Sequence, residues 1–287
     1  MNLDANDPIK KFMTSKYEKL AQERYFTVSD GSELRVLLSN AQITTSSGFT
    51  LLLIPGWNTV VPSWEEVLLE AMKDFDIIYI ETREKGSSKL NKKTKNNPDR
   101  FSSDVKEILE ELGIEQNKLV IFASSFGVFF VADGLASEKY NPFLTFFLGP
   151  SLKFNMPPTT KYIMHVLPNV TLELTKPIWR WWIRTRKSEN PEQAAKYIRA
   201  LEEADASKWR SVSKRFNFVH FGETYKEIKS KVIVIGMEKD KMHKAEEARS
   251  ISQYITNSAY IDMGTNKLTH SIEMVEKIRT LIKKKEK

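Results

Sequence analysis

One serine in the chain lies in a setting that suits a nucleophile. Ser125 follows the apolar run 118–122 and precedes a second apolar stretch, with the small residues Ala123 and Gly127 two positions away on either side. Where a strand turns sharply into a helix, the residue at the apex is exposed and its flanking positions tolerate little side chain, because the two backbones pass close together. The pattern small-x-Ser-x-small therefore predicts that Ser125 is the nucleophile of an acyl-transfer reaction.

Two other interpretations of this turn stay open. A serine before a helix is more often an N-cap, whose hydroxyl accepts a hydrogen bond from the backbone of the first helical turn. Ser124 could also be the nucleophile, but Phe122 and Phe126 would then occupy the two tight positions. Ser125 is the better candidate, although a five-residue match by itself is weak evidence.

A base and an acid follow Ser125 along the chain, each after an apolar run. His270 precedes the last predicted helix, and a histidine can take the serine proton near neutral pH and return it later. Asp240 follows the run 232–236 and would fix the tautomer of the imidazole, although Glu238 in the same loop is a rival. The order Ser, Asp, His at successive strand ends predicts a catalytic triad. The remaining histidines are expected to be structural or exposed: His165, His220 and His243.

An acyl-transfer site also needs N–H donors for the oxyanion of its intermediate. The backbone amides of Phe126, directly after the serine, and of Trp57, in the loop after the run 49–54, suit this role. Gly56 would let the Trp57 loop approach closely, although an ordinary turn at the end of a strand would use the same glycine.

The segments that must position these residues alternate between strand and helix. Two strands, 24–28 and 33–38, are predicted to form a hairpin through Asp30-Gly31. Short continuous apolar runs are typical of strands buried on both faces of a parallel sheet. Such runs are 49–54, 76–80 and 118–122, and the segments 143–148, 231–235 and 259–263 continue the strands. Helical spacing is found at 64–75, 101–112, 128–136 and 272–284. The alternation predicts an α/β fold with a doubly wound, mostly parallel sheet.

The alternation stops between Gly149 and Lys229, where no buried strand run is found. We expect an inserted helical cap or lid in this region, including a helix from Pro191 to Ala204 that begins with a proline. The predicted organisation is a core in two parts, 1–150 and 231–287, with the cap at 151–230.

These features resemble the α/β-hydrolase superfamily from about Tyr25 to Ile282. The family's loop after the fourth strand is usually written Asp-x-Arg-Gly-x-Gly-x-Ser, and the segment 81–88 is similar, with Arg83, Gly86 and Ser88 in place. The segment 234–240 looks like the family's acid loop, which favours Asp240. Gly264 and His270 likewise resemble the last strand and the catalytic histidine. The resemblance implies a serine hydrolase with Ser125, Asp240 and His270 as its triad.

Departures from the family pattern disfavour some groups of relatives. Pro55-Gly56 stands where relatives commonly have His-Gly, which disfavours the esterases and lipases with a His-Gly-Gly-Gly run. Glu81 and Glu84 depart from the fourth-strand loop. A serine at position 125 argues against relatives resembling haloalkane dehalogenases, which use Asp there, and dienelactone hydrolases, which use Cys.

The expected reaction is cleavage of a small carboxylic ester or thioester through an acyl-enzyme on Ser125, without cofactor or metal. Cap residues are expected to line the acyl pocket: Trp179, Trp181 and Trp182, and with them Trp209, Phe216 and Phe218. Transfer of carrier-bound fatty acyl groups is the rival reaction, and a non-catalytic binding module on the same fold is the rival from another class.

Composition limits the partners and the compartment. The formal net charge of +7 comes from scattered Lys and Arg residues, so we expect a solvated surface and no nucleic-acid partner. There is no cysteine, which excludes disulfides and thiolate nucleophiles. The polar start of the chain is unlike a signal peptide and no stretch is apolar enough to span a membrane, so a cytoplasmic protein is expected. Arg180, Arg184 and Arg186 leave peripheral membrane contact open, and the sequence does not indicate an oligomeric state.

Overall fold

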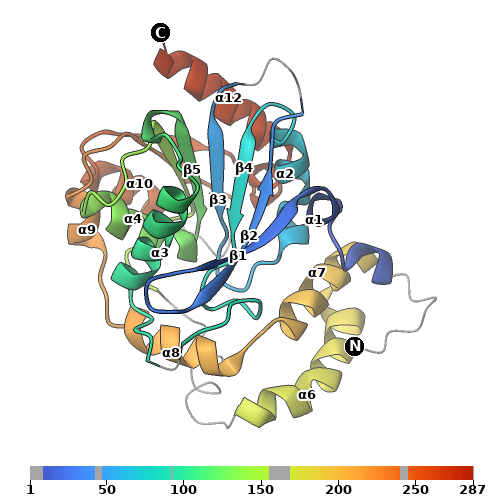
Figure 1. The fold of residues 1–287 in the computed structure, drawn as a ribbon. Coiled ribbons are helices and arrows are strands. Elements are labelled where there is room, and N and C mark those ends of the chain that lie inside the picture. Colours follow the sequence, from blue (N-terminus) through green and yellow to red (C-terminus); the bar gives the residue numbers. More distant parts are fainter. Residues whose placement is uncertain (1–8, 43–46, 92, 155–168, 240–244, 287) are drawn as a thin grey trace.

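A central sheet of eight strands organises the molecule (Figure 1). The computed structural model describes residues 9–42, 47–91, 93–154, 169–239 and 245–286. The strand order is β1-β2-β4-β3-β5-β6-β7-β8. The strands are β1 (Gln22–Thr27), β2 (Glu33–Ser39), β3 (Thr50–Ile54), β4 (Asp76–Ile80), β5 (Leu119–Ser124), β6 (Leu144–Leu148), β7 (Val232–Gly236) and β8 (Ser258–Asp262). The pairs β1·β2 and β2·β4 are antiparallel and the other neighbours are parallel. The predicted hairpin and mostly parallel sheet are confirmed.

Helices cover both faces of the sheet, so each face has its own apolar core. One layer holds α1 (Lys16–Leu20), α2 (Glu65–Ala71) and α12 (Ile272–Glu286), and the other holds α3 (Pro98–Glu111), α4 (Phe126–Ala136) and α10 (Ala245–Tyr254). In β3, Leu51 and Leu53 face the first layer, whereas Leu52 and Ile54 face the second. Successive side chains of a strand point to opposite faces, which is why these strands are continuously apolar in sequence.

Some helices differ from the sequence predictions. The helix predicted at 64–75 is the shorter α2, which begins after the 3₁₀ turn η2 (Val61–Trp64) and gives way to a turn after Ala71. The helices α1 and α10 in the two layers were not predicted. The helix α1 is too short for a periodic signal and is instead defined by a capping box between Ser15 and Glu18. The helix α10 is mainly polar and buries only Ala248 and Ile251.

The segment between β6 and β7 contains no strand among its described residues, as expected. It contains α6 (Asn169–Trp182), the π turn η4 (Ile183–Lys187), α7 (Pro191–Glu202), α8 (Ala206–Phe216) and α9 (Gly222–Lys226). In Figure 1, α6, α7 and α8 gather at one end of the molecule, beyond the carboxyl ends of the parallel strands. We call this segment the insertion. The division into a core at 1–150 and 231–287 and a cap at 151–230 stays a prediction.

No helix within the described residues is long and apolar enough to cross a membrane. The short elements that complete the chain are η1 (Lys10–Phe12), η3 (Gln116–Lys118) and α11 (Asn266–Thr269).

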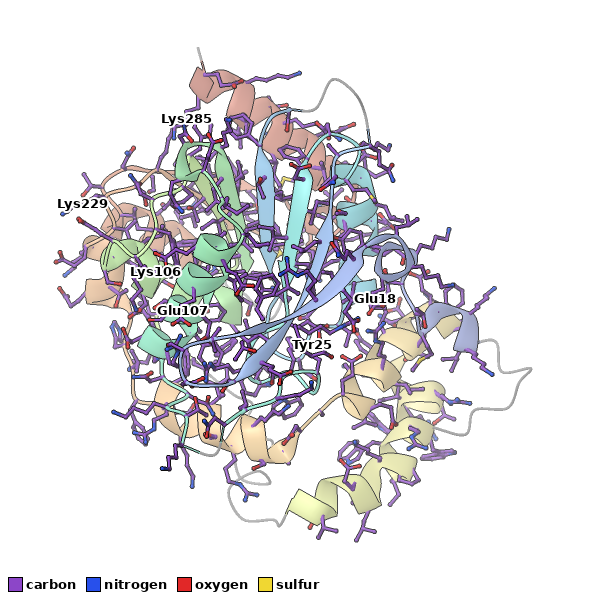
Figure 2. The ribbon with its side chains drawn as sticks, viewed as in Figure 1. Glu18, Tyr25, Lys106, Glu107, Lys229 and Lys285 are labelled. Carbon is purple, nitrogen blue, oxygen red and sulfur yellow. The ribbon has the colours of Figure 1, made fainter. Side chains whose placement is uncertain are left out.

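One carboxylate ties the insertion to the start of the chain. Arg199 on α7 donates two hydrogen bonds to Glu18 on α1, at 2.5 and 2.6 Å, and Figure 2 labels Glu18 beside the ribbon of α7. Arg35 on β2 adds a third contact at 3.2 Å. Burial raises the pKa of the Glu18 carboxyl, but the hydrogen bonds and charge of Arg199 outweigh it and hold the pKa below its ordinary value of 4.5.

Glu18→Gln should lower the free energy of unfolding at pH 7 by about 2 kcal/mol, because a buried ion pair loses one partner. The carboxylate stabilises the wild type fully above pH 4.5, and this contribution is lost as the pH falls through the lower pKa of the folded protein. The variant should therefore lose less stability than the wild type on acidification below pH 4.5. Urea unfolding at a series of pH values measures both effects.

Glu23→Gln is the matched control, since Glu23 also pairs with Arg35 but its side chain is 48% exposed. A change within about 0.5 kcal/mol is expected there, because exposed ion pairs contribute little. Equal losses of unfolding free energy in the two variants would contradict a larger contribution from the buried ion pair of Glu18.

Candidate active site

Ser125 occupies a strained turn between β5 and α4. Its φ of 48° and ψ of −109° lie in a region that residues with a side chain rarely adopt. The N–H of Ser125 donates to the Leu148 oxygen at 2.8 Å, and the Ser125 oxygen accepts from the N–H of Val128 at 3.0 Å. The hydroxyl makes no capping hydrogen bond with α4, so the N-cap interpretation is wrong. Ser124 is the buried last residue of β5.

Two glycines allow this turn to lie against the loop that follows β3. A Cβ atom at Gly127 would lie 2.9 Å from the Ile54 oxygen and 3.0 Å from the Pro55 oxygen. A Cβ atom at Gly56 would lie 3.4 Å from Cβ of Ser125. Backbone carbonyls cannot move aside as a flexible side chain can, so position 127 admits only glycine. This contact explains why the nucleophile pattern needs a small residue at position 127.

The side chains of the two candidate oxyanion donors, Trp57 and Phe126, are in contact. The rings of Trp57 and Phe126 meet edge to face, with centroids 5.0 Å apart. Within the described residues, neither backbone N–H donates to a protein acceptor. Phe126 is the first residue of α4, where amides have no partner inside the helix. Both amides are thus available to an oxygen outside the chain.

His270 follows α11 and lies over the same edge of the sheet. Its ring stacks on Trp64 with centroids 4.1 Å apart, and Trp64 packs against Phe122 of β5 at 5.4 Å. Nδ1 of His270 is 2.9 Å from the backbone oxygen of Asn266. A carbonyl oxygen can only accept, so Nδ1 carries the proton and Nε2 is left as the basic nitrogen. This is the tautomer that a general base for a serine needs.

The acid of the predicted triad is not placed by the structure, because Asp240 lies outside the described residues. The rival Glu238 is exposed and forms an ion pair with Arg249 at 3.2 Å. Its backbone N–H donates to Asp262 at 3.1 Å. The side chain of Glu238 is thus directed to a surface arginine, which does not favour it as the acid.

Of the other histidines, only His220 lies within the described residues. His165 and His243 lie outside the described residues, and Nδ1 of His220 accepts from the N–H of Gly222 at 3.2 Å, a local structural contact. Across the part of the chain that the structure describes, no three His, Asp or Glu side chains come close enough to hold a metal ion.

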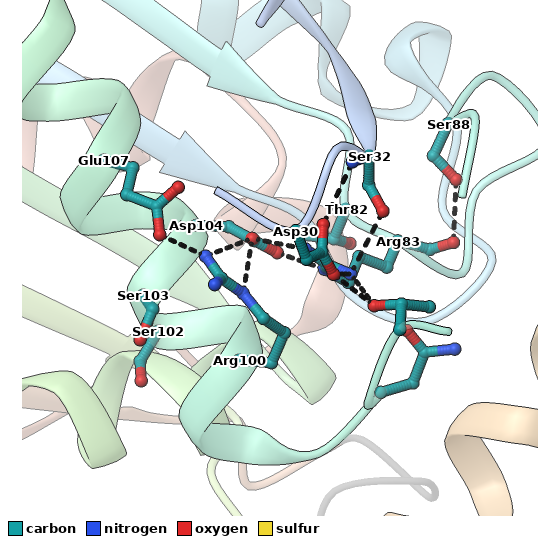
Figure 3. A network of polar contacts seen from close by, with 12 residues as sticks. Asp30, Ser32, Thr82, Arg83, Ser88, Arg100, Ser102, Ser103, Asp104 and Glu107 are labelled. Carbon is teal, nitrogen blue, oxygen red and sulfur yellow. Dashed lines mark hydrogen bonds and ion pairs between the residues drawn. The ribbon is translucent and has the colours of Figure 1, made fainter. Parts of the chain in front are cut away.

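A buried arginine organises the loop after β4 (Figure 3). Arg83 is fully buried and binds Asp104 on α3 with two hydrogen bonds, at 2.5 and 2.7 Å. It also pairs at 2.7 Å with Asp30 in the hairpin turn, and Ser88 donates to its backbone oxygen at 2.7 Å. Burial raises the pKa of Asp30, but hydrogen bonds from Arg83 and Thr94 more than offset this and lower the pKa overall. The loop is therefore fixed by charge-assisted contacts to both the hairpin and α3.

Glu81 and Glu84, the departures from the family's loop pattern, are both buried. Glu81 pairs with Arg35 at 3.1 Å, and Oε1 of Glu84 accepts from Thr82 at 2.8 Å.

Aromatic residues of the insertion cover the two oxyanion candidates. Trp209 on α8 lies 5.5 Å from the ring of Trp57, and Phe154 lies 5.0 Å from it. Phe216, also on α8, lies 4.8 Å from the ring of Phe126. Helix α8 therefore packs aromatic side chains against Trp57 and Phe126.

The other aromatic residues proposed for the pocket lie elsewhere. Trp179, Trp181 and Trp182 on α6 are 42%, 60% and 40% exposed. Trp179 and Trp182 pack edge to face against each other. Phe218 is exposed as well. Their role as pocket walls stays a prediction, and their exposure favours a surface position instead.

Sequence reasoning did not single out Lys85, whose ammonium group contacts the loop after β3. Nζ donates to the backbone oxygen of Gly56, the residue before Trp57, at 2.7 Å. The family's loop pattern leaves this position unspecified, so no motif could have indicated it.

Ser125→Gly should raise the free energy of unfolding by about 1 kcal/mol, because glycine adopts positive φ without strain. Ser124→Gly is the matched control in the last position of β5, where glycine should lower stability by about 0.5 to 1 kcal/mol. Urea titration of both variants measures the difference. A loss of stability in Ser125→Gly would contradict the presence of strain at the turn.

Comparison with solved structures identifies the fold. No protein-family model and no curated protein matches the sequence. An esterase from Exiguobacterium antarcticum is similar in structure with a TM-score of 0.70 at 14% identity, over 93% of this chain and 100% of that one. A bromoperoxidase from Bacillus anthracis has a TM-score of 0.69 at 16% identity, over 92% and 100%. An enol-lactonase from Burkholderia xenovorans has a TM-score of 0.66 at 15% identity, over 91% and 97%. At these identities the likeness concerns the fold alone, and the chain has the α/β-hydrolase fold, with helices inserted between β6 and β7.

Proposed function

We propose that this protein is a serine hydrolase that cleaves a carboxylic ester or thioester through an acyl-enzyme on Ser125. The observation that carries the proposal is the strained turn at Ser125, held against a loop whose Trp57 amide has no protein acceptor among the described residues. Strain at a functional turn has to be stabilised by the rest of the fold, and an exposed nucleophile is a reason to keep it. Likeness in fold to an esterase and an enol-lactonase supports hydrolysis.

The proposed mechanism gives each candidate residue one role. Oγ of Ser125 attacks the acyl carbonyl while Nε2 of His270 takes its proton. The N–H groups of Trp57 and Phe126 bind the oxyanion, and the proton on His270 passes to the leaving group. Water then attacks the acyl-enzyme by the same steps, with His270 again as the base. Asp240 is the acid that we propose to stabilise the imidazolium.

The substrate's acyl group would lie against the aromatic wall of the insertion. Trp209 and Phe216 approach Trp57 and Phe126 from α8. Burial of apolar surface against such rings favours an aliphatic or aromatic acyl chain. In this proposal residues 151–230 act as the cap, and the partner is a small molecule.

A fluorophosphonate probe should label the wild type and leave Ser125→Ala unlabelled, because the probe reacts with an activated serine hydroxyl. Mass spectrometry of the labelled peptide locates the adduct. Ser124→Ala is the control and should still react. An unlabelled wild type, or equal labelling of Ser125→Ala, would refute the proposal at this serine. Analysis of products with water and with an alcohol acceptor distinguishes hydrolysis from acyl transfer.

Asp240→Asn should lower kcat on a nitrophenyl ester by about 100-fold, since a neutral amide cannot stabilise the imidazolium that forms on His270. Glu238→Gln should change kcat by less than about threefold, because its partner is the surface residue Arg249. Steady-state kinetics on both variants decide between the two acids. The reverse outcome would assign the acid to Glu238.

A further inference from the structure

Lys85 is a buried lysine that lies against the loop after β3. Its side chain is 5% exposed, whereas lysine is almost never fully buried without a partner for its charge. Nζ donates to the backbone oxygens of Gly56 at 2.7 Å and Thr59 at 3.0 Å. It also lies 3.4 Å from Oε1 of Glu84. Two hydrogen bonds to backbone oxygens and one ion pair thus hold the ammonium in place.

The contact with Gly56 bears directly on the Trp57 amide, because both belong to one peptide group. The peptide bond between Gly56 and Trp57 is planar and trans, so the carbonyl oxygen and the amide hydrogen point in opposite directions. An ammonium that binds the oxygen on one side therefore fixes the direction of the N–H on the other. A positive charge at the oxygen also polarises the amide and makes its N–H a stronger donor.

The backbone of Lys85 is itself held by the insertion. Lys208 on α8 donates to the backbone oxygens of Lys85 at 2.8 Å, Gly86 at 3.1 Å and Ser88 at 2.6 Å. A Cβ atom at Gly86 would lie 2.3 Å from the backbone oxygen of Glu203, so the loop and the insertion are in direct contact. Lys208 thus holds the backbone of the loop after β4, whereas the contact with the Gly56 oxygen comes from the Lys85 ammonium.

We propose that Lys85 is a positioning residue for the oxyanion hole, in which its ammonium binds the Gly56 oxygen and thereby directs the Trp57 N–H at the substrate's carbonyl oxygen. The inference rests on the proposed function, and no bond to Lys85 forms or breaks during the reaction. Negative charge develops on the substrate oxygen mainly in the transition state. Lys85 therefore acts on the chemical step and leaves binding of the substrate nearly unchanged.

Lys85→Met removes the ammonium and keeps most of the side chain. We expect kcat on a nitrophenyl ester to fall by about 10- to 100-fold, less than for loss of a whole oxyanion donor, with KM within about threefold. An alkyl trifluoromethyl ketone forms an anionic hemiketal with Ser125, and its affinity should fall by a similar factor. The methyl ketone of the same chain length does not gain that charge, and its affinity should be retained.

Lys208→Met is the matched control, because Lys208 also binds backbone oxygens but none in the loop after β3. Both variants should have a lower Tm than the wild type. The ratio of the two ketone affinities should fall in Lys85→Met and stay near the wild-type value in Lys208→Met. Equal ratios in the two variants would overturn the positioning role, since general loosening of the loop would then explain the loss.

Labelling by the fluorophosphonate separates the two proposals. A wild type that does not label at Ser125 refutes the hydrolase and the role of Lys85 together. A wild type that labels, with an unchanged ketone ratio in Lys85→Met, refutes the role of Lys85 alone. If Lys85→Met does not fold, Lys85→Gln gives the same comparison with a neutral donor. Failure of both to fold, while Lys208→Met folds, would assign Lys85 to the stability of the fold and overturn the inference.

Discussion

The close approach of two backbone turns, one after β5 and one after β3, is the constraint on which the rest of the candidate site depends. Gly127 has no room for a side chain against the carbonyls of Ile54 and Pro55, and Gly56 passes beside Ser125. Parallel pairing of β3 with β5 brings the ends of the two strands to the same edge of the sheet. Packing of both faces of that sheet stabilises the strain at Ser125, since a single turn could not maintain it alone.

Buried charges fix the next layer of loops around this contact. Arg83 joins the hairpin to α3, Lys85 contacts the loop after β3, and Lys208 joins α8 to the loop after β4. Each charge is paired or bound to several backbone oxygens, as burial of a charge requires. Buried ion pairs contribute little net stability, because removal of the ions from water costs about as much as their attraction returns. We infer that their main effect here is to select one geometry for the loops.

The fold alone does not decide the reaction. An esterase, a bromoperoxidase and an enol-lactonase all share this architecture with the chain at low identity. Function has to be argued from the site, and the site here offers a strained serine, a histidine with Nε2 as its basic nitrogen, and two backbone amides. Helix α8 of the insertion packs Trp209 and Phe216 against Trp57 and Phe126. In the proposed function the core supplies the reacting groups and the insertion selects the substrate.

Local patterns in the sequence determined the strands, the hairpin and the turn at Ser125. Continuous apolar runs indicated the parallel strands, Asp30-Gly31 indicated the hairpin, and Ala123 and Gly127 indicated the turn at Ser125. These features could be predicted because burial on both faces, positive φ and close packing each restrict residue types at short spacing.

Only the tertiary structure decided which distant residues meet. It paired Glu18 with Arg199, which are 181 positions apart, and placed Lys85 beneath a peptide 29 positions away. It also placed the α6 tryptophans at the surface and the α8 aromatic residues at the site. Aromatic and charged residues have the same local pattern whether they face water, a core or a substrate. Their surroundings depend on how the elements pack, and periodicity along the chain contains no information about that packing.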